Sequence, residues 1–289
     1  MPQFQRVCAI ASMTLVFLAL AAKSDVRTKY PEPEDGTVHN GVFQDEYFGL
    51  TYALPSGWVE DLKGPAPSSS GYYSLAALKP EGDLSATIQI SAQDNFFAAQ
   101  PPKDAADFLA AMKRGLDPSL SATEAIATPS IGGLRFARLD YSGAGLNHTV
   151  LATEIRCHTV IFAITAGSED TIAKLVRSLE KISFAQPAGP RSWPVCVSES
   201  DYKDYIAHTV DPVMTGPRYG SVPVRIIVGA DGKLEHVHAF AGFPEQITSV
   251  TDALTKWEFK PYVVDGKPVE VETALLFEFP RAQRLRNAP

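Results

Sequence analysis

A proline-containing stretch at residues 185–194 (AQPAGPRSWP) constrains the fold most, because it interrupts the pattern of strands and helices. Proline lacks a backbone N–H and fixes φ near −65°, so neither a helix nor a central strand continues through such a stretch. A chain of 289 residues is also large for one small hydrophobic core. We therefore predict two domains, at residues 42–184 and 212–280, joined by a linker at 185–211.

The beginning of the chain indicates export. Residues 7–22 form an apolar run of 16 residues without a charge. As a helix this run would span roughly 24 Å, which is less than a hydrocarbon core of about 30 Å. Ala19 and Ala21 supply an A-x-A cleavage pattern. We predict a signal peptide at 1–22, a flexible segment at 23–41, and a location in the periplasm or cell envelope, with a retained membrane anchor as the alternative.

The charge of the chain disfavours polyanionic partners. Its formal net charge is −7, whereas nucleic acids and anionic lipids are bound by basic faces. The C-terminal residues 281–289 carry several arginines and are predicted to form a basic, solvated tail. We expect no nucleic-acid partner, and no stable membrane span if the signal is cleaved.

Residues 42–184 predict an α+β domain. Apolar residues alternate in short strands, a helix follows Asp104 and ends at Gly115, more strands follow, and Ser168 caps a second helix. This order is typical of an antiparallel sheet covered by helices. The stretches YFGLTYALPSGW and LEKISF, which open and close the domain, resemble the PsbP-like (Mog1-like) α/β/α sandwich. That resemblance implies a binding role, since the family is largely non-enzymatic.

The sequence pattern of the second domain predicts the order strand, strand, helix, strand. Asp231-Gly232 stands between two apolar alternating runs, which is a strong hairpin signal. A helix is expected to start at Pro244, and the last strand is expected at Glu270–Phe279.

This second segment, at about 212–279, resembles the C-terminal domain of TonB-family proteins. The resemblance is carried by a set of turn, aromatic and proline positions: Asp231, Gly232, Trp257, Phe259, Pro261, Gly266, Lys267, Pro268, Val269 and Phe279. It implies a small domain of ββαβ order that recruits a protein, such as an outer-membrane receptor or its peptide, by adding a strand to an exposed sheet edge. The expected partner-binding edge strand comprises Val269, Val271, Thr273, Leu275 and Phe277. Alternatively, this strand is an ordinary edge protected by its charges.

The resulting hypothesis is an exported, protein-binding module of the cell envelope. A membrane-anchored, TonB-like energy transducer for outer-membrane transport is the main alternative. It would need a retained membrane helix and a long proline-rich rod, whereas the proline-rich part of this linker would span only roughly 30 Å when fully extended. A small-molecule-binding protein or a hydrolase is a further alternative.

The sequence gives little indication of catalysis, and we expect no catalytic, cofactor or metal residues. His236 and His238 would share one strand face and could begin a metal site, but a third ligand is missing nearby, so solvent-facing histidines are expected. Cys157 and His158 would point to opposite faces, which argues against a thiol–imidazole pair. In an oxidising compartment Cys157 and Cys196 either form a disulfide or remain as two thiols.

Overall fold

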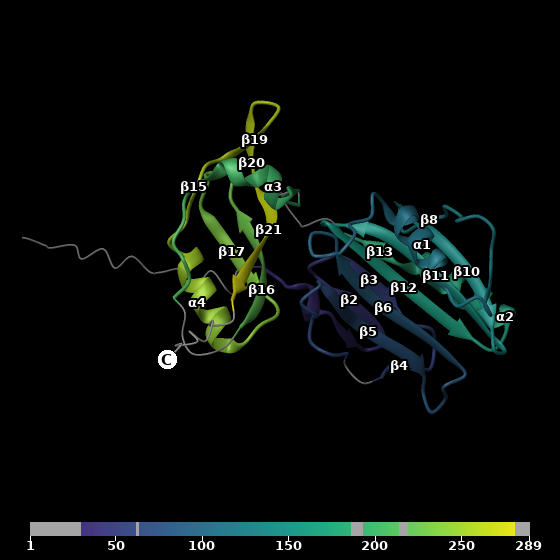
Figure 1. The fold of residues 1–289 in the computed structure, drawn as a ribbon. Coiled ribbons are helices and arrows are strands. Elements are labelled where there is room, and N and C mark those ends of the chain that lie inside the picture. Colours follow the sequence, from purple (N-terminus) through teal and green to yellow (C-terminus); the bar gives the residue numbers. More distant parts are fainter. Residues whose placement is uncertain (1–29, 62–63, 186–192, 214–218, 281–289) are drawn as a thin grey trace, which may run out of the picture.

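The computed structural model describes residues 30–61, 64–185, 193–213 and 219–280. The predicted signal peptide at 1–22 and the basic tail at 281–289 lie outside the described residues, as do residues 186–192 of the predicted linker. Two sheet-based units lie next to each other, with the N-terminal unit in purple to teal and the C-terminal unit in green to yellow (Figure 1). The fold is a mixed α+β arrangement of mostly antiparallel sheets.

The N-terminal unit is built on a seven-stranded antiparallel sheet of order β4-β5-β6-β12-β11-β10-β7. Its strands are β4 (Trp58–Glu60), β5 (Tyr72–Pro80), β6 (Ala86–Asp94), β7 (Ser121–Ala122), β10 (Ala137–Gly143), β11 (Leu146–Ile155) and β12 (His158–Ala166). The central strands β6, β12 and β11 are rich in branched apolar residues, which fits strands that are covered on both faces.

Each face of this sheet has its own apolar layer. On one face α1 (Ala105–Arg114) packs through Leu109 against strands β10 and β11. On the other face α2 (Glu169–Ser178) packs through Ile172 and Leu175. Both helices begin as predicted, because the side chains of Asp104 and Ser168 accept hydrogen bonds from the first-turn backbone N–H groups of Asp107 and Thr171.

A small second sheet lies in the layer of α2 and adds strands to that side of the predicted α/β/α sandwich. It has the order β1-β2-β3-β13 and comprises β1 (Thr37–His39), β2 (Val42–Asp45), β3 (Leu50–Ala53) and β13 (Ser183–Phe184). Its aromatic side chains Phe43, Phe48 and Tyr52 are fully buried in the same core as α2. The predicted flexible segment 23–41 is therefore wrong for residues 33–39, which form the 3-10 turn η1 (Pro33–Asp35) and β1. Short elements β8 (Ser130–Ile131), β9 (Leu134–Arg135) and η2 (Leu179–Lys181) complete the unit.

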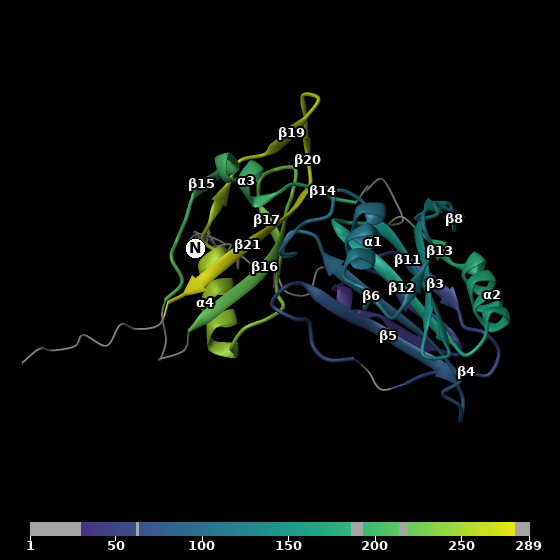
Figure 2. The ribbon, with the colours of Figure 1, turned by 45° about the vertical axis from the view of Figure 1, so that its right-hand side comes forward.

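The C-terminal unit is a four-stranded sheet of order β14-β21-β16-β17, against which helix α4 packs. The elements are β14 (Val195–Cys196), β16 (Gly220–Val228), β17 (Leu234–Ala239), α4 (Pro244–Leu254) and β21 (Val271–Phe279). Strand β16 lies beside β21 in both views (Figures 1 and 2). The predicted hairpin turn is present, with Gly232 at φ 80°, and Pro244 opens the predicted helix. The core consists of Val222, Val224, Ile226, Val237, Val250, Leu254 and Leu275.

Part of the predicted linker belongs to this second unit. Besides β14, it contains α3 (Glu199–Tyr202), η3 (Lys203–Tyr205) and β15 (Ile206–His208), and β15 pairs with β18 (Glu258–Phe259). The aromatic stretch before the last strand forms the hairpin of β19 (Tyr262–Val264) and β20 (Lys267–Val269), which projects from the unit in Figure 1. Among the described residues, no helix combines the length and the apolar character that crossing a bilayer requires.

Candidate functional site

Strand β21 has one side paired throughout and one side paired only at its start. Strand β16 accompanies it along its whole length, from Val271 opposite Val228 to Phe279 opposite Gly220. On the other side β14 covers only Val271 and Glu272. Within the part of the chain that the structure describes, no strand pairs with this side of β21 beyond Glu272. The candidate site is this open edge.

The hydrogen bonds to β14 show which residues turn their backbone to the open edge. The N–H of Val195 donates to the carbonyl of Glu270 at 2.8 Å, and the N–H of Val197 donates to the carbonyl of Glu272 at 3.1 Å. Backbone direction alternates with a period of two along a strand. The residues that present N–H and C=O groups at the open edge are therefore the next even-numbered ones, Ala274, Leu276 and Glu278.

This alternation of backbone direction changes the role of the residues that were predicted to form the edge. Val269 lies in β20, where it pairs with Tyr262, and is not part of β21. Val271, Thr273, Leu275 and Phe277 lie in β21, where Val271 and Leu275 are buried in the core of the C-terminal unit and Phe277 packs against it, while Thr273 is also buried. Their backbone groups face β16. The side chains of these four residues of β21 stabilise the strand, and the residues between them present their backbone groups at the open edge.

A hollow lies beside the open edge. The cavity next to β21 has a volume of about 620 Å³, compared with about 480 Å³ for a cavity elsewhere in the molecule. Residues of both units line it: Ser69, Asn95, Phe96, Phe97, Ala98, Pro101, Ser198, Glu199, Ser200, Ser221, Ala274 and Leu276. Leu276 is 46% exposed. An added strand would therefore find main-chain groups at the edge and an apolar side chain beside them.

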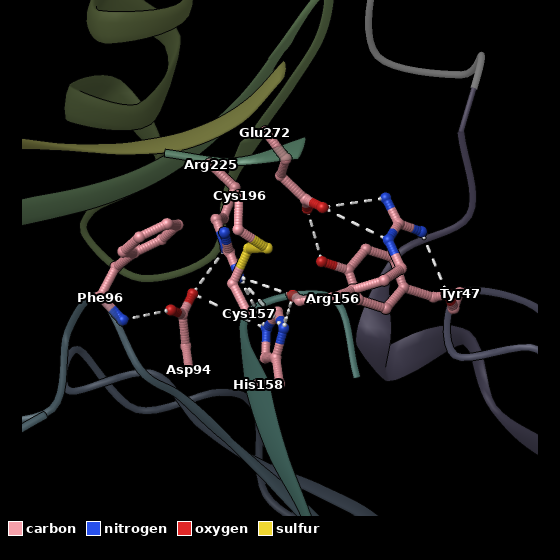
Figure 3. The surroundings of a disulfide bond; sticks show 9 residues. All are labelled: Tyr47, Asp94, Phe96, Arg156, Cys157, His158, Cys196, Arg225 and Glu272. Atoms are coloured by element: carbon pink, nitrogen blue, oxygen red, sulfur yellow. Dashed lines mark hydrogen bonds and ion pairs between the residues drawn. A yellow bond between two sulfur atoms is a disulfide. The ribbon is translucent and has the colours of Figure 1, made fainter. Parts of the chain in front are cut away.

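Glu272 anchors the closed end of β21 to the N-terminal unit (Figure 3). Its carboxylate accepts hydrogen bonds from Arg156 Nη2 at 3.2 Å and from the Tyr47 hydroxyl at 2.6 Å. The Arg156 guanidinium also lies 3.8 Å from the centre of the Tyr47 ring. Burial alone would raise the pKa of Glu272, but the neighbouring Arg225 and Arg156 lower it below its ordinary value. Glu272 is therefore ionised and paired at neutral pH.

A second buried pair lies beside the first. Arg225 of β16 places Nε 2.7 Å from Oδ2 of Asp94, the last residue of β6, and both side chains are almost fully buried. Nη2 of Arg225 lies 3.1 Å from Nδ1 of His158, and the guanidinium lies 4.7 Å from the centre of the Phe96 ring. Burial and the nearby Arg225 lower the pKa of His158 well below its ordinary value, so this imidazole is neutral.

A disulfide joins the units at the same place. Cys157 is bonded to Cys196, with their Cα atoms 5.8 Å apart, which settles the alternative between a bridge and two thiols. Arg156 and Cys157 form the two-residue turn between β11 and β12, and both have left-handed backbone, with φ of 50° and 62°. Such a conformation is unfavourable for non-glycine residues. The ion pair of Arg156 with Glu272 and the disulfide of Cys157 with Cys196 hold this turn in place. The turn therefore contacts the C-terminal unit through both of its residues.

His236 and His238 share one face of β17, as predicted, but they are buried and do not face solvent. Glu32 and Glu34, from the segment around η1, lie against them: Nε2 of His238 is 2.9 Å from Oε1 of Glu34. No local pattern predicts this contact, because His238 and Glu34 are 204 residues apart.

Burial of Asp45 near this interface predicts a pH effect on stability. Its carboxyl is 2% exposed, and burial raises its pKa to about 7. The folded state therefore binds a proton that the unfolded state loses near pH 4, and stability falls as pH rises from about 4 to 7. In Asp45→Asn this contribution is absent. We expect the variant to gain about 2 kcal/mol relative to the wild type between pH 5 and pH 8, measured by urea unfolding at both pH values. If the difference in free energy of unfolding between the variant and the wild type is the same at pH 5 and pH 8, the prediction is wrong.

These features define a protein of two α+β units, joined by buried ion pairs and a disulfide, with an open strand edge beside the junction. No known protein family and no curated protein match the chain. Two of the solved structures that share limited similarity with it are a cyanobacterial protein and a mycobacterial protein. The cyanobacterial PsbP (CyanoP) of Synechocystis sp. PCC 6803 has 15% identity and a TM-score of 0.35, covering 52% of this chain and 96% of its own.

The second similar structure is LpqN of Mycobacterium tuberculosis, described as involved in cell envelope biogenesis. It has 14% identity and a TM-score of 0.33, and the match covers 47% of this chain and 83% of LpqN. At these TM-scores the two similarities assign neither a family nor an activity to this chain.

Proposed function

We propose that this protein is an exported, non-enzymatic module of the cell envelope that binds a protein partner by strand addition at the open edge of β21. The observation that carries the proposal is the half-paired state of β21, where β14 ends after Glu272 and leaves the outward backbone groups of Ala274, Leu276 and Glu278 beside an apolar hollow. Strand addition uses such groups for affinity and neighbouring pockets for specificity.

Two further observations support the proposal. The order of β16, β17, α4 and β21 matches the order expected from the TonB-like sequence pattern. The disulfide between Cys157 and Cys196 fits an oxidising compartment, as the predicted signal peptide does. The titratable groups at the junction are engaged with one another in ion pairs and hydrogen bonds, which favours a structural role for them.

Leu276→Pro tests the proposal. Proline at this position removes one N–H from the open edge without removing a bond to β16, so folding should be retained while pairing is lost. We expect peptides selected from a random displayed library against the wild type to lose at least about tenfold in affinity for Leu276→Pro, since loss of one main-chain bond and the steric block together exceed about 1.4 kcal/mol. Titration of each purified protein with the same peptides measures this.

Leu276→Thr is the matched control, because it keeps the N–H and suits a strand while shortening the apolar side chain. It should bind more tightly than Leu276→Pro. Amide hydrogen exchange of Ala274, Leu276 and Glu278 gives a second measurement, since a paired strand should protect these three amides. Equal affinity of both variants, or no added protection at these amides, would mean that the edge is not the binding surface.

The energy-transducer alternative is decided separately. A transducer keeps its N-terminal apolar run in the inner membrane, whereas the proposed module begins near residue 22 after cleavage. Mass spectrometry of the protein from fractionated cells distinguishes the two, and an intact Met1 in the membrane fraction would favour the transducer.

A further inference from the structure

A cluster of potential metal ligands lies at the far edge of the C-terminal sheet from β21. It contains Glu32, Glu34 and His238, whose ligand atoms all lie within 4.8 Å of one another. His238 projects from β17, while the two glutamates come from the segment that begins the N-terminal unit. The cluster thus contains residues from the N-terminal unit and from the C-terminal unit.

The distances fit a bound metal ion. Nε2 of His238 is 2.9 Å from Oε1 of Glu34 and 3.5 Å from Oε2 of Glu32. Ligand atoms that sit about 2.1 Å from one metal ion are separated from one another by about 3.0 to 3.5 Å. The two separations that involve His238 therefore already match those of ligands on a common ion.

The surroundings hold the ligands in place and leave one side open. The His238 ring packs against the rings of Tyr73 and Phe240, with centroids 6.4 and 5.5 Å away. Oε2 of Glu34 is buried and has no hydrogen-bond partner in the structure, which is costly for a carboxylate oxygen. A cavity of about 480 Å³ adjoins the cluster and is lined by all three ligands. An ion here would be reached through this cavity and would keep a position for water or a small anion.

His236 provides further support. It lies two residues before His238 on the same buried face of β17, and its Nε2 is 3.8 Å from Oε1 of Glu32. Glu32 thus turns one carboxylate oxygen toward each imidazole. Paired histidines facing carboxylates are the donor set of zinc, manganese and iron sites, whereas calcium and magnesium prefer oxygen ligands alone.

We propose that Glu32, Glu34 and His238 bind a divalent transition metal ion of the zinc class, which fastens the N-terminal segment to β17. The alternative for the same geometry is a simple ion pair between His238 and the glutamates. The two differ in whether the protein takes up an added ion and in whether each of the three side chains contributes to that uptake.

Isothermal titration of the metal-free, full-length exported chain with ZnCl₂ tests the proposal. We expect one Zn²⁺ per chain, weaker binding of Mn²⁺ as the general affinity order of these ions requires, and no uptake of Ca²⁺ at the same concentration. Titration with Co²⁺ should give visible absorption bands of nitrogen and oxygen coordination. An absence of Zn²⁺ uptake overturns the proposal.

Glu34→Gln and His238→Gln should each weaken Zn²⁺ binding by at least about tenfold, because even the loss of outer-shell partners costs 10- to 100-fold. Glu34→Gln is isosteric and half-exposed, so it keeps the test valid if His238→Gln fails to fold. His208→Gln, which replaces an exposed histidine, is the matched control and should bind like the wild type. Zn²⁺ binding that survives Glu34→Gln unchanged, or that is lost equally in His208→Gln, overturns the proposal.

The outcome is independent of partner binding at β21. The metal ligands lie at β17, and β16 separates that strand from β21. Leu276→Pro should therefore bind Zn²⁺ like the wild type, and Glu34→Gln should bind the selected peptides like the wild type.

Discussion

Replacement of Arg225 by methionine is expected to reduce the free energy of unfolding by about 3 to 5 kcal/mol, since it leaves the buried Asp94 carboxyl without its partner. Arg225 is 3% exposed and Asp94 is fully buried, with 2.7 Å between their charged atoms. The same guanidinium also contacts His158 and the Phe96 ring, so its loss removes several contacts between the units. Urea unfolding followed by circular dichroism measures the change.

Arg138→Met is the matched control. Arg138 forms an ion pair with Asp140 at 2.9 Å, but both side chains are about one-third exposed, so loss of this pair should cost less than about 1 kcal/mol. The double variant Arg225→Met/Asp94→Leu should regain part of the lost stability, because it removes both buried charges together. A loss in Arg225→Met no larger than that in Arg138→Met would mean that the buried pair does not stabilise the contact between the units.

The local elements follow from short-range sequence signals. Ser168 was expected as a helix N-cap and acts as one, because a cap depends on a side chain and a backbone N–H only a few residues apart. Asp231-Gly232 likewise forms the expected turn, since Gly232 adopts the positive φ that the turn requires. These features depend on neighbours in the sequence, so a single sequence is enough to predict them.

The contacts between the units depend on residues far apart in the chain and were missed. The Tyr47 hydroxyl meets Glu272, 225 residues away, and no local pattern indicates that meeting. One signal was present: Arg225 interrupts the apolar strand Val222–Val228, and a charge in such a strand requires a buried partner. Glu32 and Glu34 gave no comparable signal, because acidic residues among prolines are typical of solvated segments.

The open edge of β21 shows a third kind of feature, one that a single sequence predicts only in part. Alternation along the strand predicts which side chains share a face, and it correctly separates Leu275 from Leu276. It does not predict toward which neighbouring strand each backbone group points, because this depends on where β14 and β16 pair. The edge residues could therefore be chosen only once the register was known.

Removal of the disulfide is expected to lower the free energy of unfolding by roughly 4 kcal/mol in the chain-entropy model for a loop of this size. Cys157 and Cys196 are separated by 39 residues, and the loop between them includes the proline-containing stretch at 185–194. Opening it gives the unfolded chain more conformations while leaving the buried ion pairs of the folded state in place. The variant is Cys157→Ser/Cys196→Ser, and its unfolding by urea is compared with that of the oxidised wild type.

The shape of that unfolding transition tests how the two units depend on each other. The chain was expected to contain two domains joined by a linker, yet the buried Asp94 and Glu272 each pair with an arginine of the other unit, and each would lack that partner in a separated unit. We therefore expect the disulfide-free variant to unfold in one transition at a lower urea concentration, with circular dichroism and tryptophan fluorescence changing together. Two separated transitions would show that the units fold independently once the covalent link is removed, and a loss below about 1 kcal/mol would show that the non-covalent contacts hold them together without the disulfide.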